Sequence, residues 1–221
     1  MEYTYPLYEH FYSWQGEGIH AGLPAYFLRL YGCPIKCPWC DSAGTWHPNY
    51  RPKHISKFTS QELIDFIRGG TTGKCNFVVV TGGEPAIYDL RDLCNSLRSN
   101  GFRSHLETSG AYPVNGVFDW VTVSPKEYKL PLQSNIELAD EVKLIVDKIG
   151  CIEYWISQFN MVGKNVILNP EWSVSKDPVI LNYITQSVQK YGFRAGLQLH
   201  KYYKSDLLDS NCKQDVPLGG K

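Results

Sequence analysis

The most constraining feature of this sequence is the run NFVVVTGG at residues 76–83, in which a continuous apolar stretch ends in two glycines. A strand that is buried on both faces carries apolar side chains at successive positions, whereas a half-exposed strand alternates. The run therefore predicts a central strand of a parallel sheet. Parallel strands need long crossover connections, so we expect helices to cover the sheet.

The rest of the chain repeats the alternation of short strands with helices. Residues 59–62 have the spacing of a capping box and predict a helix that ends at the glycine pair 69–70. Further helices are expected over residues 87–100 and 177–192. The other strands are expected at residues 25–31, 102–108, 119–124, 141–146, 165–169 and 193–200. Such βα repeats predict an α/β chain whose sheet is either open or curled into a partial barrel.

The composition excludes several classes of protein. A length of 221 residues suits one large domain, since ~150 residues per domain is the usual expectation. The 22 Lys and Arg residues balance 22 Asp and Glu residues, so no net charge favours nucleic acid or an acidic membrane. No segment approaches the ~18 to 20 apolar residues of a membrane span, and the first residues lack a secretory signal. We expect a cytoplasmic protein with neither nucleic acid nor membrane as a partner.

The run GCPIKCPWCDS at residues 32–42 contains Cys33, Cys37 and Cys40. In a reducing compartment, a tight cysteine cluster indicates metal binding or catalysis more often than disulfides. One alternative is a zinc site with His47 as a fourth ligand, although the chain has only one C-x₂-C pair. The other is a four-iron cluster, which three cysteines would leave with one iron free of protein ligands.

Polar segments follow several of the expected strands. In sheets of this kind, the chemistry collects at the carboxyl ends of the strands. We therefore expect five loops to face one cleft. They are residues 33–41, TGGEP at 81–85, ETSG at 107–110, SPK at 124–126 and NPEW at 169–172.

Two of these motifs, taken together, resemble the radical SAM enzymes. They are the C-x₃-C-x₂-C run with Trp39 before its last cysteine, and the strand that ends in GGEP at residues 82–85. The resemblance implies a partial, TIM-like βα barrel over residues 1–201. It also implies a [4Fe–4S] cluster on Cys33, Cys37 and Cys40, whose free iron is chelated by S-adenosylmethionine. Gly82 and Gly83 would let the backbone approach this cofactor closely.

A narrower resemblance covers residues 8–201. SWQGEG at 13–18, Arg29, the Cys-Asp-Ser run at 40–42, TGGEP, SPK and QLHK at 198–201 are similar to the 7-carboxy-7-deazaguanine synthase family. The similarity implies a lyase of queuosine and deazapurine biosynthesis, which converts 6-carboxy-5,6,7,8-tetrahydropterin to 7-carboxy-7-deazaguanine with loss of ammonia. A 5′-deoxyadenosyl radical would take hydrogen from C6 of the substrate. Mg²⁺, a homodimer and a flavodoxin-like electron donor are implied as well.

The resemblance also assigns site residues position by position. Glu107 would take part in proton steps, Arg29 would meet the substrate carboxylate, and Ser42 would bind Mg²⁺. The pterin would be lined by Trp14, Gln15, Gly16, Glu17, Arg29, Thr81 and His200. S-adenosylmethionine would be bound by Trp39, Cys40, Asp41, Gly83, Glu84, Ser124, Pro125, Lys126, Asn169, Pro170 and Glu171.

Two departures from the family pattern matter. Ser42 stands where the family commonly has Thr, so we expect Mg²⁺ dependence that is retained but weaker. Residues 202–221 extend beyond short-tailed relatives, and we expect them to close over the cleft as a lid; the alternative is a poorly ordered tail. Two other functions remain open from the residues alone. They are a different radical SAM reaction, such as activation of a glycyl-radical enzyme, and a zinc-stabilised binding module without catalysis.

Overall fold

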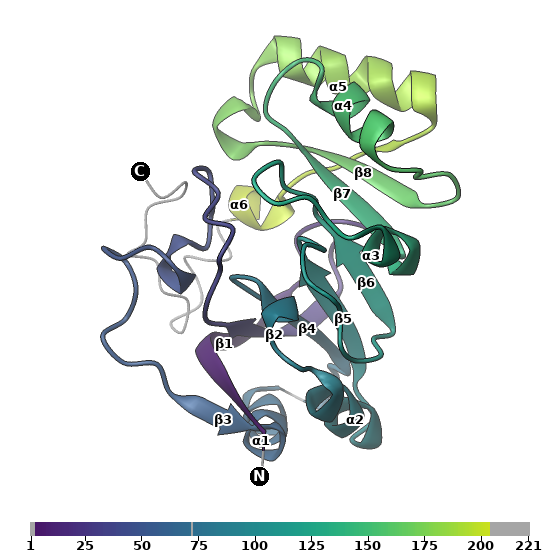
Figure 1. Ribbon diagram of the computed structural model, residues 1–221. Coiled ribbons are helices and arrows are strands. Elements are labelled where there is room, and N and C mark those ends of the chain that lie inside the picture. The colour runs from purple at the N-terminus through teal and green to yellow at the C-terminus, as the bar shows by residue number, and fades with distance from the viewer. Residues whose placement is uncertain (1–2, 72, 204–221) are drawn as a thin grey trace.

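The computed structural model describes residues 3–71 and 73–203. Within these residues, nine strands form one sheet in the order β3-β1-β2-β4-β5-β6-β7-β8-β9 (Figure 1). β3 and β9 lie at opposite edges and do not pair, so the sheet curves without closing. β2 and β4 to β9 are mutually parallel, while β1 runs antiparallel to both β2 and β3. This architecture confirms the expected partial βα barrel.

The bounds of the elements are as follows. The strands are β1 Thr4–Trp14, β2 Pro24–Leu30, β3 Lys57–Thr59, β4 Phe77–Gly82, β5 Arg103–Thr108, β6 Trp120–Val123, β7 Glu141–Val146, β8 Asn165–Pro170 and β9 Arg194–Ala195. The α-helices are α1 Ser60–Gly70, α2 Arg91–Ser99, α3 Gln133–Leu138, α4 Cys151–Gln158, α5 Pro178–Tyr191 and α6 Leu199–Tyr203. Three short 3₁₀ helices are η1 Ala43–Thr45, η2 Pro85–Ile87 and η3 Trp172–Val174.

The main core lies between the sheet and helices α1, α2, α4 and α5. Side chains alternate between the two faces of a strand, so one set of residues in β7 faces these helices. Val142, Leu144 and Val146 belong to this set and pack in the core with Ile152 and Trp155 of α4. The intervening residues of β7 point to the concave face of the sheet. Burial of both faces explains why β4 reads as a near-continuous apolar run.

The predicted helix ends are confirmed by their caps. At the start of α1, Glu62 N–H donates to Thr59 Oγ1 at 3.3 Å and Thr59 N–H donates to Glu62 Oε2 at 2.8 Å, which completes the capping box. At the start of α5, Val179 N–H donates to the Asp177 carboxylate at 2.8 Å. Gly192 ends α5 in the left-handed region, with φ of +71°, which an L side chain rarely adopts.

Several predicted elements are wrong in type or length. The strand expected over residues 193–200 is only the two-residue β9, and the chain then turns into helix α6. The turn is stabilised by a hydrogen bond from Leu199 N–H to Gly16 O, which draws α6 toward the end of β1. The helix expected from residue 87 begins instead at Arg91, after the 3₁₀ turn η2. Strands β1 and β3 and helices α3 and α4 were not predicted.

The expected lid begins at the edge of the described chain. Tyr202 and Tyr203, at the start of the expected lid, belong to α6, while residues 204–221 lie outside the described residues. Among the helices that the structure describes, none has the length and apolar character needed to cross a membrane.

Candidate active site

A cavity opens at the carboxyl ends of the parallel strands. All five loops that were expected to face one cleft contribute to its wall, so that expectation is confirmed. The predicted site residues that line it are Glu17, Cys33, Cys37, Trp39, Cys40, Asp41, Ser42, Thr81, Gly83, Glu84, Glu107, Ser124, Lys126, Pro170 and Glu171. The predicted residues that are not in its lining are Trp14, Gln15, Gly16, Arg29, Pro125, Asn169 and His200.

The cysteine loop forms one wall of this cavity. Cys33, Cys37 and Cys40 sit in an apolar setting with Ile35 and Ala111, next to the rings of Trp39 and Tyr112. Burial raises the pKa of all three thiols, that of Cys40 to about 11, so bare thiolates are disfavoured there. A bound cation reverses this preference, because thiols deprotonate when they coordinate metal.

The arrangement of the thiols bears on which metal group they fit. In the described part of the chain, no three His, Cys, Asp or Glu side chains gather closely enough to hold a single metal ion. His47, the fourth ligand of the alternative zinc site, does not line the cavity, and its Nδ1 accepts from Asn49 N–H at 3.2 Å. Three cysteines that share a wall without converging on a point fit a multi-iron cluster, with apolar neighbours to shield it.

The glycine pair at the end of β4 fastens the cysteine loop to the sheet. A Cβ on Gly83 would lie 2.3 Å from Gly32 O and 2.8 Å from Cys33 Cβ, so only glycine fits. Gly82 has φ of +150°, and a Cβ there would lie 2.2 Å from Leu30 O. Gly83 N–H and Glu84 N–H donate to Leu30 O and Gly32 O at 3.0 and 2.8 Å. Both glycines are therefore required by the close packing of this loop against residues 30–33, independently of any contact with a cofactor.

The Glu84 side chain is saturated by its own protein. Its carboxylate is 1% exposed and accepts from Ala86 N–H at 3.0 Å, Thr108 Oγ1 at 2.5 Å and Ser109 N–H at 2.8 Å. The Ser109 hydroxyl donates to the same carboxylate. The three donors from Thr108 and Ser109 tie the loop after β4 to the end of β5. The carboxylate therefore stabilises the cavity wall. The cofactor contact that the sequence predicts for Glu84 is then left to the backbone of its loop.

Lys126 lines the cavity beside Trp39, with its ammonium over the Trp39 ring. Its Nζ donates to Ser124 O at 2.8 Å and Ser124 Oγ at 2.6 Å, and it lies 5.2 Å from the centre of the Trp39 ring. Burial lowers the pKa of Lys126. The contacts join the loop after β6 to the cysteine loop, which brings two predicted cofactor-binding segments together.

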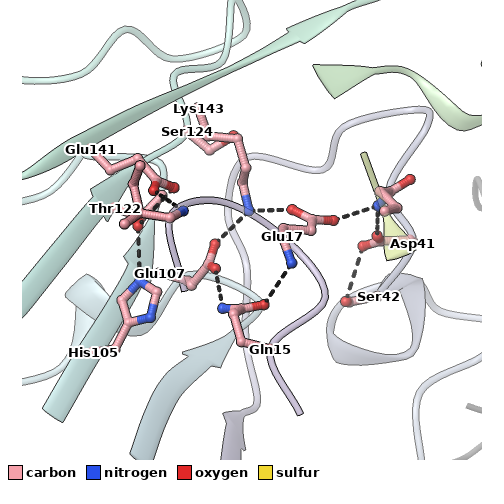
Figure 2. Close-up of polar contacts among 12 residues, drawn as sticks. Gln15, Glu17, Asp41, Ser42, His105, Glu107, Thr122, Ser124, Glu141 and Lys143 are labelled. Atoms are coloured by element: carbon pink, nitrogen blue, oxygen red, sulfur yellow. Dashed lines mark hydrogen bonds and ion pairs between the residues drawn. The ribbon is translucent and has the colours of Figure 1, made fainter. Parts of the chain in front are cut away.

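A hydrogen-bonded network of one lysine, two glutamates and two glutamines crosses the floor of the cavity (Figure 2). Lys143 Nζ, from β7, donates to Glu17 Oε2 at 2.5 Å and to Glu107 Oε2 at 2.7 Å. Gln15 Nε2 donates to Glu107 Oε1 at 3.0 Å, and Gln198 Nε2 donates to Glu17 Oε1 at 2.7 Å. Burial lowers the pKa of Lys143, but the two carboxylates raise it more, so the net pKa lies above its usual value.

Sequence reasoning missed Lys143, although a signal was present. In EVKLIV at residues 141–146, two charged residues stand two positions apart in an otherwise apolar strand. Side chains two positions apart share a face, so Glu141 and Lys143 point together into the barrel. Ile145 also lines the cavity and was not predicted. Ile35, Thr108, Ser109, Trp172, Gln198 and Lys201 line it too; they belong to predicted loops or to the QLHK motif but had been assigned no role.

A second polar layer lies beneath this floor. His105 Nε2 is 2.8 Å from Thr122 Oγ1, which donates to Glu141 Oε1 at 3.3 Å (Figure 2). Glu141 Oε2 accepts from Ile19 N–H at 2.8 Å. Burial lowers the pKa of His105 well below its usual range and raises the pKa of Glu141. The inner face of the barrel is therefore polar for two layers below the cavity.

Arg29 has the anionic partner that its position inside an apolar strand predicts. Its Nε donates to Glu9 Oε1 at 2.6 Å, and the Glu9 side chain is 7% exposed. Its Nη1 donates to Ser42 Oγ at 2.9 Å, and the Ser42 hydroxyl donates to Asp41 Oδ1 at 3.3 Å. Arg29 therefore reaches the cavity wall through Ser42.

The remaining predicted residues pack near the cavity or behind it. His200 lies on helix α6, where a strand was expected, and a Cβ on Gly16 would come within 2.1 Å of its Nδ1. The Trp14 ring meets that of Tyr203 edge-on, with centroids 5.5 Å apart. Helix α6 thus packs against the end of β1 and the segment that follows it. Asn169 is fully buried, and its side-chain amide has no hydrogen-bond partner among the described residues.

Comparison with known proteins identifies close relatives. A family model described as a 4Fe–4S single cluster domain matches residues 14–147. A 7-carboxy-7-deazaguanine synthase from Synechocystis is 41% identical over 202 residues, which cover 90% of this chain and 92% of the relative. The synthase of the same name from Escherichia coli is 39% identical over 171 residues, 67% of this chain and 75% of its own. The crystal structure of QueE from Escherichia coli superposes with a TM-score of 0.78 at 31% identity, covering 89% of this chain and 95% of that one.

Proposed function

The chain belongs to the 7-carboxy-7-deazaguanine synthase family, and we propose on this basis that it converts 6-carboxy-5,6,7,8-tetrahydropterin to 7-carboxy-7-deazaguanine with release of ammonia. It is a lyase of the radical SAM type, in the biosynthesis of queuosine and related deazapurines. The observation that carries the proposal is that three cysteines and the Glu17–Lys143–Glu107 cluster line one cavity. A radical initiator and an acid–base site are therefore side by side.

Cys33, Cys37 and Cys40 would hold the [4Fe–4S] cluster, as their shared, shielded wall of the cavity supports. When bound, the cluster supplies one electron for reductive cleavage of S-adenosylmethionine. We assign the binding of S-adenosylmethionine to the loops that meet beside the cysteines. The assigned residues are Trp39, Cys40, Asp41, Gly83, Glu84, Ser124, Pro125, Lys126, Asn169, Pro170 and Glu171; Glu84 would act through its backbone and through the loop that its carboxylate holds.

Proton transfer and substrate binding are assigned to side chains of the protein. Glu107 is 17% exposed and lines the cavity, so it can accept a proton from a bound substrate. Arg29 carries the guanidinium that we assign to the substrate carboxylate. The pterin itself would be bound by the Trp14–Glu17 segment, Thr81 and His200. In support, α6 packs against that segment, and Gln198 donates to Glu17.

We propose that Mg²⁺ binds at Ser42. The Ser42 hydroxyl and the Asp41 carboxylate lie beside each other in the cavity wall, and both are oxygen donors of the kind that Mg²⁺ prefers. One lone pair of Ser42 Oγ accepts from Arg29 Nη1, so the other remains for the cation.

Three further features follow from the family resemblance. We propose that the protein acts in the cytoplasm, as a homodimer, and receives its electron from a flavodoxin-like donor. A mass of about 50 kDa by light scattering would support the dimer, since the chain has a mass of 25.2 kDa. Turnover with reduced flavodoxin in place of a chemical reductant would support the donor.

The proposed function is tested by anaerobic reconstitution with iron and sulfide. The enzyme then receives reductant, S-adenosylmethionine, Mg²⁺ and 6-carboxytetrahydropterin, and 7-carboxy-7-deazaguanine is measured by mass spectrometry. We expect product together with about four irons per chain. If 5′-deoxyadenosine appears without this product, the radical initiation stands and the substrate assignment is wrong.

Two cysteine variants control the experiment. Cys37→Ala removes a thiol from the cavity wall and should abolish both the cluster and the product. Cys94→Ala removes a buried thiol of α2 that is part of the core and does not line the cavity. This second variant should keep its iron, and the pair separates loss of a ligand from loss of any cysteine.

A further inference from the structure

Lys143 is a buried cation whose contacts span three separate parts of the chain. It projects from β7, while Glu107 comes from β5 and Glu17 from the segment after β1. Its side chain is 9% exposed, and the carboxylates that it contacts are 11% and 17% exposed. A buried ammonium is costly unless it is paired, so these contacts are needed for folding. The three side chains also line the cavity.

The contacts leave each carboxylate with a fixed donor on both oxygens. Glu107 accepts from Lys143 on Oε2 and from Gln15 on Oε1. Glu17 accepts from Lys143 on Oε2 and from Gln198 on Oε1. Four hydrogen bonds from three side chains, Lys143, Gln15 and Gln198, therefore set the orientation of both groups before any substrate is bound. Such preorganisation is what an acid–base site requires.

The charges in the cluster do not cancel. Two carboxylates share one ammonium, which leaves a net charge of −1 within the cluster. Among the described residues, Glu141 and His105 beneath it and Asp41 and Lys126 in the cavity wall also interact electrostatically with Lys143. Without Lys143, Glu17 and Glu107 would face each other with no cation between them. Like charges held this close disfavour ionisation of both groups, so removal of the ammonium favours uptake of a proton by one carboxylate.

We propose that Lys143 is a positioning residue for the reaction, which holds Glu107 and Glu17 in place and keeps Glu107 ionised so that it can accept a proton from the substrate. The inference rests on the proposed function and adds a residue to it. When Glu107 accepts a proton, the electron pair stays on the substrate, and the proton can leave with the released ammonia as ammonium. Lys143 itself keeps its protons throughout.

Three variants test this inference through their pH profiles. Lys143→Met removes the charge and keeps an unbranched chain, Lys143→Arg keeps the charge, and the double variant Lys143→Met with Glu17→Gln removes one charge of each sign. For Lys143→Met we expect kcat to fall by ~10²-fold or more near neutral pH, the range that acid–base groups contribute. The KM for the pterin should change less, and the acid limb of the pH–rate profile should move to higher pH. Lys143→Arg should recover most of kcat.

The double variant is the decisive comparison. It leaves Glu107 as a single carboxylate, so the acid limb should return to the wild-type position even if the KM rises. Iron content measured for every variant shows whether the cluster site has folded. If Lys143→Met does not fold, the double variant alone decides: a shifted acid limb in it would overturn the inference.

Thermal unfolding of the metal-free proteins provides a second readout. In Lys143→Met the melting temperature should rise toward wild type as the pH falls from 8 to 5.5, because protonation relieves the repulsion. The double variant should lack this trend. A pH–rate profile and a melting trend for Lys143→Met that coincide with wild type would overturn the inference alone. Absence of product from the wild type would overturn the proposed function and this inference with it.

Discussion

Substitution of Gly83 by alanine should disrupt the cysteine loop without touching a cysteine. The added Cβ would lie 2.3 Å from Gly32 O, 2.6 Å from Gly32 C and 2.8 Å from Cys33 Cβ. Two of these atoms are backbone, so no side-chain rotation can relieve the contact, and the loop after β2 must shift. Overpacking of this kind costs ~1–3 kcal/mol.

That cost can be expressed as two measurable quantities. A change of ~1–3 kcal/mol is a factor of about 5 to 150 in the population of the correctly closed loop. In a chain of this size it lowers the melting temperature by about 2–12 °C. Gly83→Ala should therefore take up less iron than wild type on reconstitution, with the lower melting temperature seen in the metal-free protein.

Gly69→Ala is the matched control. Gly69 lies in α1, and a Cβ there meets nothing within 4 Å. Alanine is favoured over glycine in a helix by ~0.5–1 kcal/mol, so this variant should melt at or above wild type and keep its iron. Full iron content and an unchanged melting temperature in Gly83→Ala would refute the claim that close approach of the two loops shapes the cluster site.

Three further perturbations test other parts of the site. Glu84→Gln should lower the melting temperature by about 3–12 °C, because in either orientation its amide NH₂ faces a backbone N–H and costs ~1.5–3 kcal/mol; a melting curve equal to wild type would contradict the role of four donors. Burial holds the pKa of His105 below its unfolded value of ~6.5, so the unfolded chain binds the extra proton and stability should be lost as pH falls below that value. His105→Gln should flatten this loss between pH 7.5 and 5, and an unchanged slope in thermal melts would count against it. For Ser42→Ala, rates with Mg²⁺ and with chelator should be equal, whereas Ser42→Thr should depend on Mg²⁺ at least as strongly as wild type; equal rates in the wild type itself would reject Ser42 as the ligand.

Most of the sheet could be predicted from the sequence because burial on both faces leaves a local signal. The runs at residues 76–83 and 141–146 are apolar at the positions that face the helices, and β4 and β7 lie within them. The caps of α1 and α5 are equally local, since each involves residues two or three positions apart. The strand β1 was missed because it contains polar residues and pairs antiparallel at the edge of the parallel array.

The loops of the candidate site were predicted for the same reason, but their internal contacts were not. That five loops meet follows from parallel strands, whose carboxyl ends share one edge of the sheet. The sequence alone determined the cysteine spacing, the parallel core and the set of loops, because each is written in neighbouring residues. Only the tertiary structure decided that Lys143 bridges Glu17 and Glu107, that the Glu84 carboxylate hydrogen-bonds to the end of β5, and that His200 lies on a helix. The contacts of Lys143 with its two carboxylates, and of Glu84 with Thr108 and Ser109, join residues that are 24 to 126 positions apart. Such pairs are fixed by the curvature and register of the sheet, which no local pattern encodes.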